Sequence, residues 1–260
     1  MIKINGSLMK GAILDMDGVL WRAKTPLCDL PSLFDNFKKN NIKVTLATNN
    51  GTQTIRGYVD KLASYGVKVE EWQVVTSPMA TAYLAKKFMP EGGPVYIFGS
   101  PALVSTLGDH GFFHSEENPQ AVVAGLSLDF NYERVKNASL MIQKGLPFYF
   151  TNPDPTYPTN EGNVPGAGTV LAALEAASGV KAQLAGKPEP FLFDVAMERM
   201  DLKADEVFVV GDRLNTDIIG GYKAGCRTVF VLSGVNNQDD LNGWEPKPDM
   251  VIENIMNLFN

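Results

Sequence analysis

The chain has 260 residues, of which 45% are hydrophobic, and its 29 acidic and 23 basic side chains give a formal net charge of −6. This length allows one large domain or two modest ones. No apolar run approaches the ~18 residues of a membrane span, and no basic stripe with interleaved aromatic residues indicates nucleic-acid binding. The N-terminus lacks an apolar signal segment. The two cysteines, Cys28 and Cys226, lie far apart in the sequence, so we expect them to be reduced thiols. We expect a cytoplasmic protein with no nucleic-acid or membrane partner.

Strands and helices are predicted to alternate along the whole chain, which favours an α/β fold with parallel sheets covered by helices. An apolar strand over residues 11–14 comes first, and a second precedes Thr48. Helical spacing of apolar residues predicts a helix over residues 54–64, and Gly66 supplies its end. A further helix over residues 79–88 runs into the Pro- and Gly-rich residues 89–94, the clearest boundary signal in the chain.

The alternation restarts after this boundary, with strands over residues 95–98, 121–126 and 148–150 and helices from residue 101 and over residues 132–144. An alanine-rich segment over residues 168–177 is apolar on most sides, so we expect a buried helix that ends at Ser178-Gly179. The pattern predicts a second α/β unit inserted within the first.

Two acids, Asp15 and Asp17, stand directly after the first strand and directly before Gly18. Ionised carboxylates are rarely buried without partners, so these acids must lie at an open strand end, where two like charges require a cation. A calcium loop of the EF-hand type is excluded, because Val19 and Pro26 occupy positions that need oxygen ligands.

Three further segments have the same form, a strand followed by polar residues. They carry Thr48, Lys187, and the pair Asp212 and Asp217. Segments distant in sequence converge beyond the carboxyl ends of the strands in open parallel sheets, so the four acids, the hydroxyl and the lysine are predicted to meet there. A Walker A loop around Lys187 is excluded, because Lys181 and Pro188 stand where that motif needs Gly and Ser or Thr.

This ordered set resembles the four motifs of the haloacid dehalogenase superfamily, matched here by residues 15–18, Thr48, Lys187, and Gly211-Asp212 with Asp217. The wider resemblance, over nearly the whole chain, is to subfamily IIA, which contains the NagD-like, 4-nitrophenyl phosphate, phosphoglycolate and pyridoxal phosphate phosphatases. Residues 23–30 depart from the group in lacking a Pro-Gly pair.

For the fold, the resemblance implies a Rossmann-like parallel-sheet core with an inserted α/β cap domain of the C2 type. The core would comprise residues 1–92 and 182–260, and the cap, residues 93–181, would cover the active site. The resemblance also implies that two chains can pair through their caps as a homodimer.

For the chemistry, the resemblance implies a Mg²⁺-dependent phosphatase that forms an aspartyl-phosphate. Asp15 would attack phosphorus, Asp17 would act as general acid and then base, and Thr48 and Lys187 would bind the phosphoryl group. The metal ligands would be the carboxylates of Asp15 and Asp212 and the backbone carbonyl of Asp17. Asp217 and Asn215 would lie behind these ligands, with Asp217 orienting Lys187 or a metal-bound water.

The substrate is expected to be a small phosphomonoester, such as phosphoglycolate, a sugar phosphate, a nucleoside monophosphate or pyridoxal phosphate. The residues expected to bind it are Asn49, Asn50, Asn152, Asp154 and Tyr157. The alternative function is a non-catalytic or signalling phospho-acceptor on the same fold. A receiver module would be about half as long, however, and would not place its lysine after a large insert.

Overall fold

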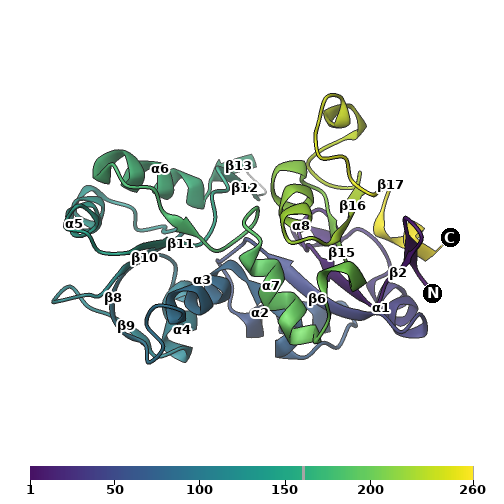
Figure 1. The fold of residues 1–260 in the computed structure, drawn as a ribbon, viewed down its shortest axis with the longest axis horizontal. Coiled ribbons are helices and arrows are strands. Elements are labelled where there is room, and N and C mark those ends of the chain that lie inside the picture. The colour runs from purple at the N-terminus through teal and green to yellow at the C-terminus, as the bar shows by residue number, and fades with distance from the viewer. Residues whose placement is uncertain (160–161, 260) are drawn as a thin grey trace. The chain divides into compact units, whose positions relative to one another are not determined.

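The computed structural model describes residues 1–159 and 162–259, and Figure 1 shows the path of the chain. The chain divides into two compact units. The first consists of Met1–Thr48, Ile55–Val75 and Lys187–Asn260, and the second of Asn49–Thr54 and Thr76–Gly186. The predicted insert, residues 93–181, lies within the second unit. That unit also contains the helix α3 (Ser77–Lys86), because Ala82 and Ala85 of this helix pack in its core.

The first unit is built on a six-stranded sheet with the strand order β17-β16-β15-β3-β6-β7. Its strands are β3 (Gly11–Leu14), β6 (Lys43–Thr48), β7 (Val74–Thr76), β15 (Val207–Gly211), β16 (Arg227–Val231) and β17 (Met250–Ile252). The central strand β3 runs parallel to both neighbours, and Leu14 is in register with Val210 of β15 and Leu46 of β6. The carboxyl ends of these three strands therefore lie at one edge of the sheet.

Helices cover this sheet because its strands are apolar on both faces. The helices are α1 (Leu30–Lys39), α2 (Ile55–Ser64), α7 (Phe191–Met200) and α8 (Ile219–Lys223). Phe37 of α1 and Leu62 of α2 pack in one core with Leu14 and Leu46. On α7, the sulfur of Met200 accepts a hydrogen bond from Thr45 Oγ1 of β6.

Short elements complete the first unit. They are the hairpin of β1 (Lys3–Ile4) and β2 (Ser7–Leu8), the hairpin of β4 (Trp21–Arg22) and β5 (Thr25–Pro26), the π-helical turn η3 (Leu214–Ile218), and the 3-10 turns η1 (Glu71–Gln73), η2 (Ala204–Glu206), η4 (Gln238–Leu241) and η5 (Ile255–Phe259). The hairpin of β4 and β5 and the turn η3 each follow a strand end that carries acids.

The second unit contains a five-stranded sheet with the order β14-β11-β10-β8-β9 and a separate two-stranded hairpin. The sheet strands are β8 (Gly93–Phe98), β9 (Phe112–His114), β10 (Val122–Ala124), β11 (Phe148–Phe150) and β14 (Gln183–Leu184). The hairpin pairs β12 (Thr156–Thr159) with β13 (Gly162–Pro165), and the helices after α3 are α4 (Pro101–Asp109), α5 (Tyr132–Gln143) and α6 (Ala167–Ser178).

Side chains alternate along the strands of the second sheet and form a core on each face. Tyr96 and Phe98 of β8 pack with α5 and α6, whereas Val95 and Ile97 pack with α3 and α4. The expectation that α6 is buried on most sides is wrong. Only Ala167, Val170, Leu171 and Leu174 are buried, and the alanines on its other side face solvent, where alanine still favours a helix.

Within the described residues, no helix combines the length and the hydropathy that a membrane crossing requires.

Candidate active site

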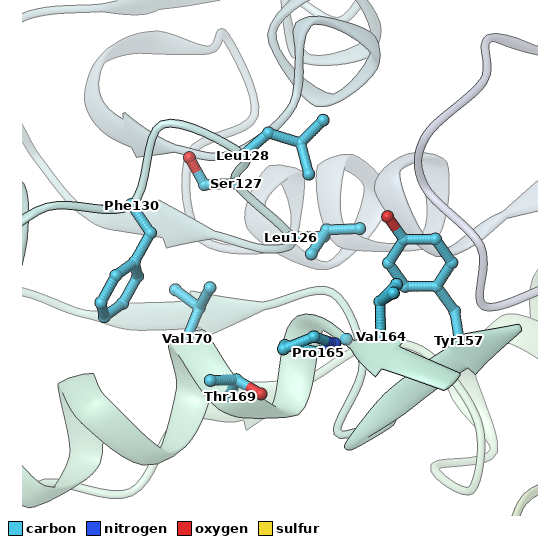
Figure 2. A pocket seen from close by; sticks show the side chains of 10 residues that line it. Leu126, Ser127, Leu128, Phe130, Tyr157, Val164, Pro165, Thr169 and Val170 are labelled. Carbon is cyan, nitrogen blue, oxygen red and sulfur yellow. The ribbon is translucent and has the colours of Figure 1, made fainter. Parts of the chain in front are cut away.

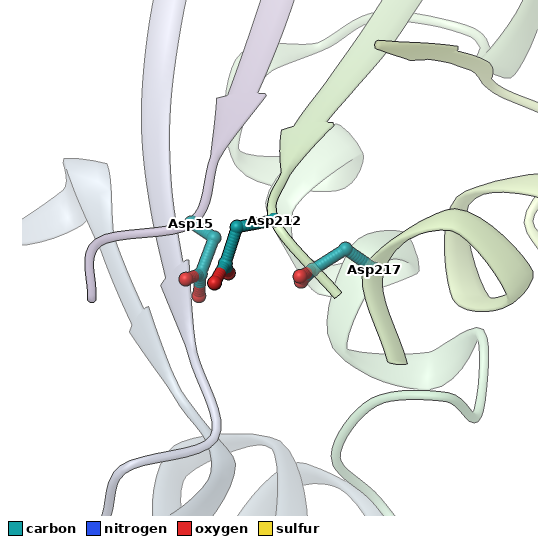
Figure 3. A group of neighbouring side chains, drawn as sticks. All are labelled: Asp15, Asp212 and Asp217. Atoms are coloured by element: carbon teal, nitrogen blue, oxygen red, sulfur yellow. The ribbon is translucent and has the colours of Figure 1, made fainter. Parts of the chain in front are cut away.

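The acidic side chains predicted at the strand ends come together at the carboxyl edge of the first unit's sheet. Asp15 follows β3 directly, Asp212 follows β15 directly, and Asp217 belongs to the turn η3. One carboxylate oxygen of each lies within 4.8 Å of the others. Figure 3 shows the carboxyl groups of Asp15 and Asp212 side by side, with Asp217 pointing towards Asp212. The backbone N–H of Asp15 donates to Val210 O at 2.9 Å, which holds the two strand ends in register.

Lys187 lies between two of these carboxylates. Its Nζ is 2.6 Å from Asp15 Oδ1, 2.6 Å from Asp217 Oδ1 and 3.2 Å from the carbonyl oxygen of Ala47. The lysine side chain is 3% exposed, and those of Asp15 and Asp217 are 11% and 1% exposed. This is a buried ion-pair network, in which removal of Lys187 would leave two buried carboxylates without their counter-charge.

The positive charge of Lys187 does not balance the three carboxylates. Burial alone would lower the pKa of Lys187, but the charges of Asp15 and Asp217 outweigh it and raise this pKa. Burial raises the pKa of Asp15 well above its usual range despite the opposing charge of Lys187. Burial, together with the charge of Asp217, raises the pKa of Asp212 to about 6. The site therefore has a deficit of positive charge, which a divalent cation would fill.

Asp212 has the features of a metal ligand. Its Oδ2 accepts the backbone N–H of Val235 at 2.6 Å, whereas its Oδ1 is buried with no hydrogen-bond partner among the described residues. Glycines make room for this carboxylate, because a Cβ at Gly18 would lie 2.3 Å from Oδ2 and a Cβ at Gly234 only 1.9 Å from it. A buried anionic oxygen without a donor is costly, so the residues present fit a hard cation at this position.

Asp217 is held differently. Its Oδ1 faces Lys187, and its Oδ2 accepts the backbone N–H of Arg213 at 3.1 Å. Both oxygens thus have protein donors. Asn215, predicted to lie behind the metal ligands with Asp217, is exposed, and the hydrogen bonds of the acidic group come instead from Lys187, Arg213 and Val235.

Two predicted site residues of the first unit contact aromatic side chains that were not among the predicted site residues. Asp17 is half-buried, and its Oδ1 accepts the indole N–H of Trp21 at 2.9 Å. Thr48 ends β6 with 2% of its surface exposed and hydrogen-bonds the hydroxyl of Tyr58, whose pKa burial raises. The helical spacing of apolar residues in α2 predicts only that Tyr58 is buried in the core. The one signal for a contact with the site is its hydroxyl group, which lies within an otherwise apolar stripe of the helix.

The remaining predicted residues belong to the second unit. Asn152 Nδ2 donates to Asn49 O at 2.8 Å, and its Oδ1 accepts the backbone N–H of Asp154 at 3.2 Å. Asn50 accepts from the backbone and hydroxyl of Thr52. Asn50 thus holds the backbone of its own loop, and Asn152 holds the backbone of its own loop and that of Asn49. Substrate binding by these residues stays a prediction.

Tyr157 lines a cavity of about 340 Å³ within the second unit. Figure 2 shows its ring beside Leu126 and Val164, with Phe130 and Val170 at the far end. The lining residues are Leu126, Ser127, Leu128, Phe130, Tyr157, Val164, Pro165, Gly166, Thr169 and Val170. None of the described residues that line this cavity carries a charge, so their side chains suit an apolar group better than a phosphate.

Comparisons with known proteins agree with this geometry. A model of haloacid dehalogenase-like hydrolases matches residues 12–113, and a model of haloacid dehalogenase-type hydrolases matches residues 184–258. Ribonucleotide monophosphatase NagD of Escherichia coli is 31% identical over 250 residues, which cover 96% of this chain and 98% of that protein.

Solved structures give the same result. 4-Nitrophenylphosphatase from Thermotoga maritima has a TM-score of 0.88 and 36% identity, with 95% of each chain covered. Glycerol phosphate phosphatase from Mycobacterium tuberculosis, in complex with magnesium, has a TM-score of 0.89 and 31% identity, with 99% of this chain and 78% of that chain covered. The same phosphatase has also been solved with calcium. By its motifs, its site and these similarities, the chain belongs to the haloacid dehalogenase-like hydrolases, in the NagD-like group of phosphatases.

Proposed function

We propose that this protein is a Mg²⁺-dependent phosphatase that hydrolyses small phosphomonoesters through a phosphoryl group carried on Asp15. The observation that supports it most directly is the buried acidic group at the carboxyl ends of β3 and β15, in which Lys187 joins Asp15 to Asp217 while Asp212 keeps a buried oxygen without a donor. Phosphoryl transfer depends on positioning and on neutralising charge, and this group supplies both.

Asp15 is the nucleophile of the proposal. An Asp15 oxygen forms a bond to phosphorus as the bond between phosphorus and the ester oxygen breaks. Asp17 gives a proton to the departing ester oxygen, which leaves as an alcohol. Asp17 then takes a proton from water as the water oxygen attacks phosphorus and displaces Asp15, so that inorganic phosphate is released. Lys187 and the hydroxyl of Thr48 stabilise the charge on the phosphoryl oxygens.

The metal of the proposal is Mg²⁺, held by Asp15, Asp212 and the carbonyl of Asp17. Hard oxygen ligands of this kind suit Mg²⁺ better than softer metals. When bound, the ion supplies charge neutralisation at Asp15 and at the phosphoryl group. Asp217 has protein donors at both oxygens, which favours a part in orienting Lys187 over direct ligation.

The relatives support this substrate class, since they include a ribonucleotide monophosphatase, a dihydroxyacetone phosphatase and an acid sugar phosphatase. We assign the second unit as the cap that selects the organic part of the ester, with Asn49, Asn50, Asn152, Asp154 and Tyr157 as the candidate contacts. Pairing of two chains through this cap is part of the proposal, and a mass measured by light scattering tests it.

The test of the function is hydrolysis of p-nitrophenyl phosphate by the purified protein with Mg²⁺, with EDTA, and after Asp15→Asn. We expect turnover only with the metal, and a loss of at least about a thousandfold in the variant, since its nucleophile is gone.

Asp29→Asn is the matched control. Asp29 caps α1 through Ser32, and Asn serves equally well as a cap, so this variant should keep full activity. Undiminished turnover by Asp15→Asn would overturn the proposal. Absence of turnover by the unmodified protein, on this ester and on a panel of phosphorylated metabolites, would favour a phospho-acceptor without hydrolytic activity.

A further inference from the structure

Trp21 is a fully buried tryptophan whose indole N–H is used by a half-buried acid and not by the backbone. Its Nε1 donates to Asp17 Oδ1 at 2.9 Å, and none of its side chain is exposed. A buried indole N–H needs an acceptor, and the acceptor at this position is the carboxylate of Asp17.

The loop between the acid and the tryptophan is closed by its own backbone. The N–H of Gly18 donates to the carbonyl of Trp21 at 2.8 Å, and the N–H of Trp21 donates to the carbonyl of Met16 at 3.2 Å. Trp21 also begins β4, where it pairs with Pro26 of β5. The spacing between Asp17 and Trp21 is therefore fixed before any substrate binds.

The indole ring contacts Lys61 of α2 and Tyr65, the residue that directly follows this helix. The ammonium group of Lys61 lies 3.9 Å from the ring centroid, and the ring of Tyr65 lies 6.0 Å away, tilted by 45°. The ammonium group of Lys61 donates a hydrogen bond to the backbone carbonyl of Ala23. The hydroxyl of Tyr65 donates one to the backbone carbonyl of Lys24. A ring held by packing, a cation and a hairpin can orient the carboxylate that it contacts.

We propose that Trp21 is the positioning residue of the Asp17 carboxylate. By occupying Oδ1 with its N–H, it leaves Oδ2 to carry the proton that passes to the ester oxygen in the first step and is replaced from water in the second. This inference rests on the proposed function, in which Asp17 is the acid and base. It adds a residue that acts through Asp17 and touches neither the substrate nor the metal.

The test is the dependence of the rate on the leaving group in Trp21→Phe. Phenyl and p-nitrophenyl phosphate have nearly the same shape, but phenol is the weaker acid and needs the proton more as it leaves. We expect kcat/KM for phenyl phosphate to fall about tenfold or more, as for the loss of a hydrogen bond to a charged group. For p-nitrophenyl phosphate we expect kcat/KM to stay within about twofold of the unmodified protein. This parameter reports only the first step, in which the more acidic nitrophenol needs the proton from Asp17 less.

The second step provides an independent readout. Because water attack also needs Asp17, kcat for p-nitrophenyl phosphate should fall while its kcat/KM does not. A rapid release of about one nitrophenolate per enzyme should then precede the slower steady state. A variant that had merely lost structure would lower both quantities together and show no such burst.

Trp72→Phe is the matched control. Trp72 Nε1 donates to Glu70 Oε2 at 2.8 Å, and this residue is 38% exposed in the same unit, so the same substitution removes the same kind of bond away from the acids. We expect this variant to leave kcat and kcat/KM unchanged for both esters. Should Trp21→Phe fail to fold, the benzothienyl analogue of tryptophan, in which sulfur replaces the N–H, keeps the ring size and removes only the donor.

A double-mutant cycle with Asp17→Asn completes the test. If Trp21 acts through Asp17, adding Trp21→Phe to Asp17→Asn costs no further activity on phenyl phosphate, whereas independent effects would multiply. Equal losses on both esters, no loss on either, or multiplying losses would each overturn the inference. Those outcomes leave Mg²⁺-dependent turnover of the unmodified protein in place, so they are distinct from a failure of the proposed function.

Discussion

Asp212 and Asp217 lie five residues apart and have opposite surroundings. Asp212 offers one oxygen to a backbone N–H and keeps the other buried without a donor, whereas Asp217 has a donor at each oxygen. The difference arises from their places in the chain, because Asp212 directly follows β15, while Asp217 lies inside the turn η3 and accepts the backbone N–H of Arg213. The same residue type is thus suited to bind a cation at one position and to hold a lysine at the other.

This difference predicts unequal effects on metal binding. Asp212→Asn should weaken Mg²⁺ binding by about a hundredfold or more, since a charged ligand is lost, and Asp217→Asn by about tenfold at most, as for a residue behind the ligands. Titration calorimetry of the metal-free protein measures both affinities. Equal losses in the two variants would place Asp217 among the direct ligands.

Lys187 gives a second prediction at the residue scale. Lys187→Met leaves Asp15 and Asp217 buried with no counter-charge, and we expect it to lower the free energy of unfolding by about 3–5 kcal/mol. Adding Asp217→Asn should restore part of that stability without restoring activity, because one of the unpaired charges is removed. Urea unfolding with EDTA at pH 7.5 measures both effects.

Lys10→Met is the control for this comparison. Lys10 pairs with Glu206, but its side chain is 56% exposed, and an exposed ion pair contributes little to stability. A loss in Lys187→Met no larger than that of Lys10→Met would mean that the buried network contributes nothing to stability.

At the scale of elements, the sequence predicts the strand ends well because apolar strands and the acids that follow them are both local signals. The strand over residues 148–150 and the helix after residue 54 match β11 and α2. The acids, Thr48 and Lys187 were predicted to meet, and Asp15, Lys187, Asp212 and Asp217 do so.

Features that depend on distant partners were not predictable from these signals. The hydrogen bonds between Trp21 and Asp17 and between Tyr58 and Thr48 arise from packing of β4 and α2 in the core, and an aromatic residue at helical spacing indicates only burial. The solvent-exposed side of α6 was missed for a related reason, since alanine suits a buried and an exposed position equally.

The loop after β16 gives a prediction about an element. Gly234 lies against Asp212, and a Cβ there would come 1.9 Å from Oδ2 and 2.2 Å from Cβ of that acid. Gly234→Ala should therefore displace the carboxylate, weaken Mg²⁺ binding by about tenfold or more, and cost about 1–3 kcal/mol of stability. Calorimetry and urea unfolding measure the two effects.

Gly108→Ala is the control substitution. Gly108 lies inside α4, and a Cβ there meets nothing within 4 Å, so alanine should stabilise the helix by up to about 1 kcal/mol. If Gly234→Ala behaved like Gly108→Ala, the loop after β16 would be loose enough to yield, and the fit around Asp212 would not depend on glycine.

For the whole molecule, the acidic group and the surface carboxylates make stability depend on pH in opposite directions. Exposed acids such as Asp29 and Asp240, whose hydrogen bonds lower the pKa, stabilise the fold above their unfolded pKa and lose that contribution as the pH falls. The pKa of Asp212 is raised to about 6 from 3.8. Its contribution is therefore present at low pH and is lost as the pH rises through about 6.

Mg²⁺ should reverse this second contribution, because the ion favours the charged carboxylates that destabilise the metal-free protein. With EDTA, we expect Asp212→Asn to be more stable than the unmodified protein at pH 7.5 by about 1–3 kcal/mol. This difference should shrink as the pH falls below 6 and vanish only below 3.8, the ordinary pKa of the carboxyl. With Mg²⁺, the unmodified protein should gain stability at pH 7.5 and little at pH 5, where protons compete for Asp212. Thermal unfolding of both proteins across this range measures the effect. Since the surface acids are common to both proteins, the difference between their stabilities isolates the contribution of Asp212. Parallel pH profiles in EDTA would mean that burial does not raise the pKa of the Asp212 carboxyl.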